Sequence, residues 1–230
     1  MNIRNKCAQA ALALGISSIS ALAGATVTVG NNDGGNCYPF SCLASEAGGT
    51  GSRYQEIYSA SAFSGVTSVG SITFFQSFAG LMDSASYSIS FYKTSVGIGG
   101  MSADADSNLG ALLSTFGTFS VSGLMPVELT FDGADFSYNP AEGNLLMDVK
   151  VLSLTESHGY QSFFQADYTG VDVVRGYAYG GDLAEFNEAG ALRTRFNDAT
   201  AVPEPGTVTL AGLALLAMVG MRRRSRQTRS

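Results

Sequence analysis

Strict alternation of apolar and small polar side chains is the feature that most restricts the fold of this chain. Over residues 86–93, Tyr87, Ile89 and Phe91 alternate with serines. Side chains on a β-strand point to opposite faces in turn, so this pattern predicts a strand with one buried and one solvated face. The same alternation, in strong or weak form, occurs in residues 72–78, 127–131, 145–151, 26–29, 54–58, 116–121, 171–179 and 192–196.

These segments are short and are separated by glycine, asparagine and serine. About eight to ten short strands at such spacing are typical of an antiparallel β-sandwich, and we expect one of the jelly-roll kind. In the segment 145–151, Asp148 and Lys150 fall on the predicted solvent face. Residues 107–114 alone favour a short helix of about two turns.

The N-terminal residues 1–25 have the three parts of a secretory signal peptide. Arg4 and Lys6 supply a basic start, residues 8–19 are an apolar stretch, and small residues follow at 21–25. Cleavage after a small-x-small sequence there leaves an exported domain of residues 26–198. We therefore expect export through the Sec pathway.

The C-terminal residues 199–230 contain three elements in a fixed order. Pro203, Glu204 and Pro205 come first, and the two prolines keep the backbone extended and accessible. Residues 206–221 are apolar and predict a short transmembrane helix. The basic tail after them is expected to stay in the cytoplasm as a stop, and it begins with Arg222, Arg223 and Arg224.

This order of motif, apolar span and basic tail resembles the PEP-CTERM sorting signal of Gram-negative bacteria. The resemblance implies processing by an exosortase-type transpeptidase, a transient anchor in the inner membrane, and a final place at the envelope surface or outside the cell. Residues 51–58, 63–65 and 138–149 also resemble exported domains that carry this tail, and this implies a β-sandwich without indicating an activity.

The exported domain is strongly acidic. Eighteen of the nineteen Asp and Glu residues lie in residues 26–198, but only six of the thirteen Lys and Arg residues do, so the net charge there is near −12. Such a surface repels nucleic acid and anionic lipid, and it favours solubility or divalent cations. Nucleic acid is therefore excluded as a partner.

Cys37 and Cys42 are the two cysteines of the exported domain. Exported proteins reach an oxidising compartment, and a four-residue interval with a central proline brings two thiols together. We expect a disulfide that holds an N-terminal loop. A metal site would need more ligands, and a redox site would favour C-x-x-C spacing.

Catalytic signals are few. His158 is the sole histidine, so a Ser-His-Asp triad would have to use it, and its sequence context favours an exposed loop instead. Carboxylate pairs that a glycosidase could use occur at Asp132 with Asp135 and at Asp182 with Glu185. Acidic residues on a solvated surface are the simpler explanation, so we expect no enzymatic activity and no required cofactor.

A loop at residues 104–110 is the candidate metal site. Asp104, Asp106 and Asn108 stand at alternate positions before a glycine, as oxygen ligands of calcium do. The loop departs from an EF-hand, because its glycine is one place late and Thr115 replaces the bidentate glutamate. The alternative is that Asp106 or Ser107 caps the following short helix.

Carbohydrate contact is a further interpretation, because sugar faces stack on aromatic rings. Tyr160, Tyr168, Tyr177 and Tyr179 lie in glycine-rich sequence, although the chain lacks tryptophan. Taken together, these patterns predict an exosortase-sorted structural or binding protein of the envelope, or of an exopolysaccharide or biofilm matrix. An exported polysaccharide hydrolase that uses a carboxylate pair and a calcium-dependent adhesin are the alternatives.

Overall fold

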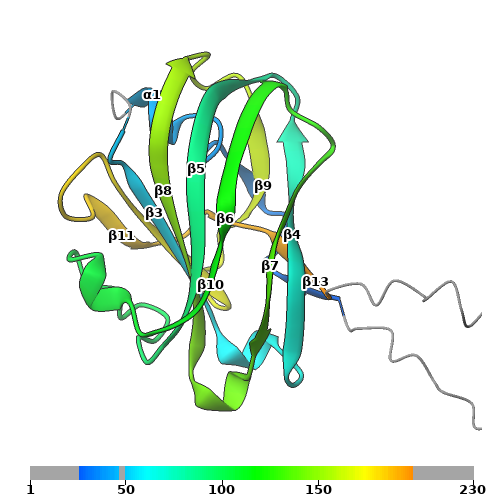
Figure 1. The fold of residues 1–230 in the computed structure, drawn as a ribbon, viewed down its shortest axis with the longest axis vertical. Helices are drawn as coiled ribbons and strands as arrows, with labels where there is room; N and C mark the ends of the chain where they lie inside the picture. Colours follow the sequence, from blue (N-terminus) through cyan, green and yellow to red (C-terminus); the bar gives the residue numbers. More distant parts are fainter. Residues whose placement is uncertain (1–25, 47–49, 199–230) are drawn as a thin grey trace, which may run out of the picture.

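Thirteen strands form within residues 26–46 and 50–198, the part of the chain that this computed structural model describes. They make two sheets that pack face to face as a sandwich (Figure 1). Every strand pairing in this part of the chain is antiparallel. The all-β antiparallel sandwich predicted by the alternation is confirmed, and its jelly-roll character stays a prediction.

The seven-stranded sheet has the order β1-β13-β4-β9-β12, with β2 pairing with β9 and β7 pairing with β4. Its strands are β1 (Val27–Val29), β2 (Gly34–Asn36), β4 (Thr67–Phe78), β7 (Glu128–Tyr138), β9 (Phe163–Asp167), β12 (Ala191–Leu192) and β13 (Thr194–Asn197). The six-stranded sheet has the order β11-β10-β3-β8-β5-β6. Its strands are β3 (Arg53–Tyr58), β5 (Leu81–Thr94), β6 (Ala111–Leu124), β8 (Asn144–Glu156), β10 (Val173–Ala178) and β11 (Glu185–Glu188).

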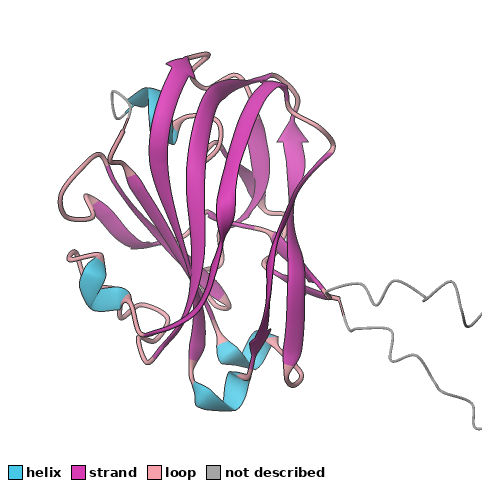
Figure 2. Cartoon of the chain, viewed as in Figure 1, coloured by secondary structure: helices cyan, strands magenta, loops and turns pink. Residues whose placement is uncertain are grey.

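Helical structure in the described residues is confined to single turns (Figure 2). These are α1 (Leu43–Glu46) and three 3₁₀ turns, η1 (Ala60–Ala62), η2 (Asp106–Asn108) and η3 (Pro140–Glu142). Within residues 26–46 and 50–198, no helix is long and apolar enough to cross a membrane. The predicted signal peptide and the predicted transmembrane helix 206–221 lie outside the described residues.

In β5, the apolar face that the alternation predicts is the face buried in the core. Tyr87, Ile89 and Phe91 are fully buried between the sheets, while the serines between them are partly exposed. On the inner face of β8, Leu145, Met147, Val149 and Val151 are buried as well. Local periodicity is therefore enough to predict which face of these two central strands points inward.

Residues 107–114 do not form the expected helix. Only the 3₁₀ turn η2 is helical, and β6 begins at Ala111 and pairs with β5. The strand can start beside β5 because Gly110 has no side chain, since a Cβ there would lie 2.0 Å from the carbonyl oxygen of Lys93. Pairing with a distant strand thus overrides the local helical signal.

Phe78 is a second difference from the expected pattern. The alternation places it on the buried face of β4 with Ile72 and Phe74, but 63% of its surface is exposed. The pairing of β4 with β9 shifts register between Gln76 and Phe78, which is the mark of a β-bulge. An extra residue at a bulge turns the following side chain to the other face.

The outer face of β3, β8 and β10 is also covered, which the sequence did not indicate. Residues 96–109 fold over it and bury a second apolar cluster. As a result Asp148, which was expected on the solvent face of β8, is only 3% exposed. The six-stranded sheet is therefore buried on both faces in this region.

The predicted disulfide between Cys37 and Cys42 is confirmed, with the two Cα atoms 5.5 Å apart. The loop that it closes does more than hold the N-terminal segment in place. Phe40, at its centre, is fully buried and contacts aromatic rings of both sheets. A short disulfide loop thus supplies a central residue of the hydrophobic core.

The first and last strands of the sandwich are neighbours. Val27 of β1 pairs with Phe196 of β13, and β13 in turn pairs with β4. Figure 1 shows both ends of the described domain leaving it on the same side. The two segments that the sequence assigns to targeting therefore attach at adjacent points of one sheet.

Candidate functional site

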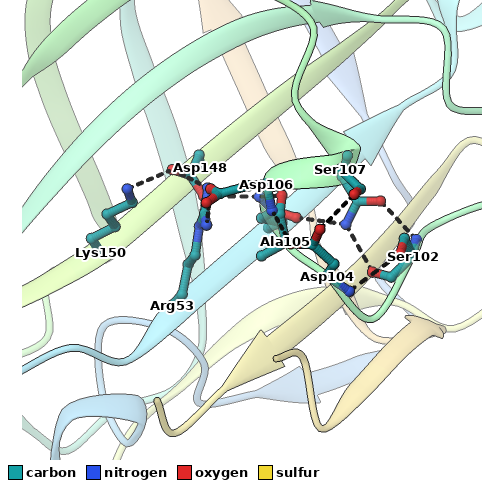
Figure 3. A network of polar contacts seen from close by, with 10 residues as sticks. Arg53, Ser102, Asp104, Ala105, Asp106, Ser107, Asp148 and Lys150 are labelled. Carbon is teal, nitrogen blue, oxygen red and sulfur yellow. Dashed lines mark hydrogen bonds and ion pairs between the residues drawn. The ribbon is translucent and has the colours of Figure 1, made fainter. Parts of the chain in front are cut away.

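Two of the proposed calcium ligands, Asp106 and Asn108, lie on η2, and Asp104 lies two residues before it. Figure 3 shows Asp104 and Asp106 in this loop, near Arg53 of β3 and Asp148 of β8.

Asn108 is fully buried, and its amide group is used within the fold. Its Oδ1 accepts a hydrogen bond from the backbone N–H of Ser102 at 2.7 Å. Its Nδ2 donates to Gln55 at 3.0 Å and to the carbonyl of Ser102 at 2.9 Å. Asn108 therefore acts as an internal brace of the loop.

Asp106 points in a different direction, toward Arg53. The Nη1 atom of Arg53 lies 2.7 Å from Asp106 Oδ1, and its Nε lies 2.5 Å from Oδ1 of the buried Asp148. Burial opposes the charge on Arg53, but the two carboxylates outweigh this effect and raise the pKa of the guanidinium. Figure 3 shows this ion-pair chain continuing to Lys150. Arg53 thus ties the loop to the sheet.

Asp104 stabilises the turn that leads into η2 through two side-chain hydrogen bonds. Its Oδ2 accepts a hydrogen bond from the hydroxyl of Ser107 at 2.6 Å, and its Oδ1 accepts one from the backbone N–H of Asp106 at 3.0 Å. The bond from Ser107, followed by that from Asp106, lowers the pKa of Asp104. Asp106 and Ser107 lie within η2, and the N-cap position of η2 is Ala105, which has no side-chain cap hydrogen bond. The expected cap by Asp106 or Ser107 is therefore wrong, and Asp104 closes a local turn instead.

The three side chains Asp104, Asp106 and Asn108 therefore do not converge on one point. In the described ranges 26–46 and 50–198, no three His, Cys, Asp or Glu residues gather as a metal site. Calcium needs six to eight oxygen ligands around one centre. We therefore expect calcium to leave the stability of this loop unchanged, contrary to the expectation from spacing alone.

This expectation is tested by melting the protein with calcium at about 1 mM and then with a chelator. The wild type should melt at the same temperature in both. The double variant Asp104→Asn/Asp106→Asn should melt at a lower temperature, because the turn bonds of Asp104 and the ion pair of Asp106 with Arg53 are weakened. The decrease should be the same in both solutions. If calcium raised the melting temperature of the wild type but not that of the double variant, the calcium-site prediction would be supported instead.

The other polar candidates from the sequence are dispersed. His158 lies in the loop between β8 and β9, where its ring approaches Glu156 at 3.6 Å. The backbone N–H of His158, and not its ring, donates a hydrogen bond to Asp83. The residues of the two carboxylate pairs are exposed, and they lie on β7, on β11 and in the loop before β11: Asp132, Asp135, Asp182 and Glu185.

Three of the four candidate tyrosines gather around Arg175 of β10. Tyr177 is buried, and the ring of Tyr179, which is 41% exposed, packs against it. Tyr168 is 50% exposed and lies near Arg175, because a Cβ on Gly190 would be 3.2 Å from its ring and 3.4 Å from Nε of Arg175. Tyr160 is exposed as well, but it lies in the separate loop between β8 and β9. Arg175 was not singled out from the sequence, although it alternates with Tyr177 on one face of a predicted strand.

Tyr38, from the disulfide loop, completes this cluster. Its ring stacks on Tyr177 with a centroid distance of 4.4 Å, and its hydroxyl is hydrogen-bonded to that of Tyr179. The Arg175 guanidinium lies 5.0 Å from the Tyr177 ring centroid and 5.7 Å from that of Tyr38. Burial, followed by a hydrogen bond with Glu185, raises the pKa of Tyr177. Residues 38 and 177 are far apart in the chain, so no local signal could join them.

Glu56 is a buried carboxylate that sequence reasoning missed. It lies on the inner face of β3 and accepts hydrogen bonds from the hydroxyls of Tyr54 and Tyr58 and from the backbone N–H of Leu192. Burial raises its pKa to about 7, against the opposing effect of these bonds and of Arg175. The sequence pattern could have indicated this burial, because Tyr54, Glu56 and Tyr58 alternate on one face of a predicted strand and place a carboxylate among core aromatic residues.

Comparison with known protein families identifies the C-terminal segment. Residues 201–224 match the PEP-CTERM protein-sorting motif. Searches of the curated proteins and of the solved structures found no match. The chain therefore carries the signal of an exported protein that an exosortase processes and that is sorted to the cell surface.

The residues predicted to form the sorting signal lie inside this match. They are Pro203, Glu204 and Pro205 of the motif, and Arg222, Arg223 and Arg224 after the apolar span. All six lie outside the residues that the structure describes. Their individual roles as recognition motif and cytoplasmic stop stay predictions.

Proposed function

We propose that this protein is a non-catalytic structural or binding component of the envelope surface or of an extracellular polysaccharide matrix. The observation that supports the proposal most strongly is the sorting motif at residues 201–224, which directly follows a folded domain ending in β13. In this proposal, Sec export and signal-peptide cleavage leave the domain outside the inner membrane. Residues 206–221 anchor it transiently until the exosortase acts.

The buried carboxylates support a structural role for the domain. Four acidic side chains in the described part of the chain are almost fully buried, and each accepts hydrogen bonds from the fold itself: Glu56, Asp83, Asp148 and Asp167. A glycosidase instead needs two carboxylates that face a shared cleft and are available to substrate. These four acidic side chains thus suit holding the sandwich together.

Replacing Pro203, Glu204 and Pro205 with alanine tests the sorting part of the proposal. Export should be unaffected, because the signal peptide is intact. The variant should then stay in the inner membrane with its tail attached, because the extended recognition motif is lost. Cell fractionation and the mass of the domain-bearing fragment measure both effects in an exosortase-bearing host.

Asp198→Ala, at the end of the described domain, is the matched control and should be processed like the wild type. A triple-alanine variant that is released with the same mass as the wild type would refute the assigned recognition motif.

A further inference from the structure

Two turns at one end of the sandwich expose large apolar side chains. Phe78 ends β4, Leu124 ends β6, and Val127 directly precedes β7. These residues are 63%, 75% and 75% exposed, respectively. In Figure 1 the two turns lie at the upper end of the sandwich, whereas both ends of the described domain leave from its side. Exposed apolar side chains that gather in one place mark an interaction surface.

Backbone contacts hold the two turns side by side. The backbone N–H of Gln76 donates to the carbonyl of Val127 at 2.9 Å, and its side-chain Nε2 donates to the carbonyl of Met125 at 2.8 Å. The backbone N–H of Met125 donates to the carbonyl of Gly80 at 2.9 Å. Phe78 lies between Gln76 and Gly80 in the chain, so it lies next to the turn that carries the other two residues. We call this area the end surface, and it consists of Phe78, Leu124 and Val127.

The two turns carry no charge. Residues 75–82 and 118–127 contain no Asp, Glu, Lys or Arg. Of the acidic residues that follow these segments, Asp83 is fully buried and Glu128 forms an ion pair with Arg195 at 2.6 Å. The domain as a whole has a net charge near −12. The end surface is therefore an uncharged apolar area on a strongly acidic domain.

This distribution of charge favours a second copy of the chain as the partner. Two copies with the same large net charge repel each other, but the repulsion between exposed charges falls off over about 8 Å at physiological ionic strength. Contact through the uncharged end keeps the acidic surfaces of the two copies apart, whereas side-by-side contact brings them together. The absence of Lys and Arg from both turns disfavours a layer of anionic lipid headgroups as the partner.

We propose that the end surface joins two copies of this chain in a two-fold, end-to-end dimer. In a two-fold dimer the same surface of each copy meets its equivalent, and an apolar surface is complementary to itself. Only three large side chains of each copy take part, so the dimer belongs to the weak and reversible class. The inference goes beyond the proposed function and does not depend on how the tail is processed.

The position of β13 gives such a dimer a structural use. Asn197, at the end of β13, pairs with Ser71 of β4. Phe78 lies further along β4, about 23 Å away at a rise of about 3.3 Å per residue. Because β13 runs antiparallel to β4, it runs away from the end surface. In an end-to-end dimer the two copies of β13 therefore point away from the interface, so the dimer can link two separate points of attachment.

The test is sedimentation equilibrium of the full chain in a density-matched detergent, from about 1 μM to about 100 μM protein. The wild type should change from monomer to dimer as its concentration rises. Leu124→Lys and Val127→Lys should each raise the dissociation constant of the dimer about tenfold or more, because each places a charge from both copies in an apolar interface. Each lysine also lowers the net negative charge, so general repulsion between copies cannot cause this loss.

Leu112→Lys and Val66→Lys are the matched controls, with the same changes of residue type far from the end surface. Leu112 lies near the start of β6 and Val66 directly precedes β4, and they are 55% and 68% exposed. Both variants should keep the dissociation constant within about twofold of the wild type. A wild type that is monomeric throughout, or a dimer that all four variants weaken equally, overturns the proposal. A dimer that none of them weakens also overturns it, because another segment, such as residues 206–221, would then join the copies.

A second measurement on the wild type covers the case in which a lysine variant does not fold. The methyl NMR signals of Leu124 and Val127 should shift between dilute and concentrated protein, while those of Leu112 and Val66 should stay in place. Shifts confined to other residues would place the contact elsewhere and refute the end surface as the interface. Contacts of the Leu124 and Val127 methyl groups with detergent chains, without any dependence on protein concentration, would assign the surface to lipid instead.

Discussion

Replacing Phe40 with alanine should lower the free energy of unfolding by about 4 kcal/mol, the size expected for removal of a large buried aromatic ring. Phe40 is fully buried, and its ring centroid lies 5.0 to 6.0 Å from those of Phe74, Tyr87, Phe131 and Phe164. These neighbours come from both sheets. The truncation therefore leaves a cavity where the two layers meet, and the strands cannot close it without breaking their pairing.

Chemical denaturation of oxidised protein measures this loss. Phe78→Ala is the matched control, because Phe78 is mostly exposed at the end of β4. It should cost less than about 1 kcal/mol. Equal losses for the two variants would mean that the Cys37–Cys42 loop does not place Phe40 between the sheets.

The second large effect is a pH dependence that originates at Glu56. Its pKa is raised from the ordinary value of 4.5 to about 7 by burial in the core. Between these two pH values, the folded state keeps a proton that the unfolded chain releases. Stability from this group is therefore complete below pH 4.5 and is lost as the pH rises through 7, by about 3 kcal/mol in all.

The surroundings of Glu56 can also accommodate its neutral form. A proton on the oxygen that faces Tyr58 can be donated to the Tyr58 hydroxyl. That hydroxyl lies 3.0 Å from Oγ1 of Thr194, which donates to the carbonyl of Leu192 at 3.1 Å. Each group in this chain then has a partner, so the neutral acid is well satisfied in the core.

Glu56→Gln should therefore fold, since its amide group can donate to Tyr58 in the same way. Its stability should match that of the wild type near pH 4.5 and exceed it by about 3 kcal/mol above pH 7. Urea denaturation at pH 4.5, 6 and 8 measures the difference. Glu188→Gln changes an exposed glutamate and is the control, so its free energy of unfolding should depend on pH as that of the wild type does. If the free energy of unfolding of Glu56→Gln had this same pH dependence, Glu56 would not be the source of the effect.

Local pattern predicted the strands that have complete alternation, and it failed where a distant contact decides the conformation. The segment 86–93 is part of β5, as expected. Residues 107–114 favoured a helix on local grounds, yet β6 forms there because it pairs along its length with β5. β9 was missed because its five residues carry too few alternating positions to be distinguished from a loop.

The candidate site was predicted only in part for the same reason. Glycine-rich sequence drew attention to Tyr168, Tyr177 and Tyr179, and these do cluster. Tyr38 and Arg175 were missed, because their role depends on stacking between residues that are distant in the chain. The calcium ligands were chosen on spacing, but Asn108 turns inward to bond with Gln55 of β3, another non-local contact.

The sequence by itself determined three features of this protein: its sorting signal, its all-β class and its disulfide. Each depends on residues that are close together in the chain, so composition, periodicity and spacing are enough to predict it. The tertiary structure alone decided that Phe40 fills the core, that Glu56 and Asp148 are buried, and that Arg175 lies among tyrosines. Burial depends on which distant segments pack together, and the order of residues along one strand does not specify its partners across the sandwich.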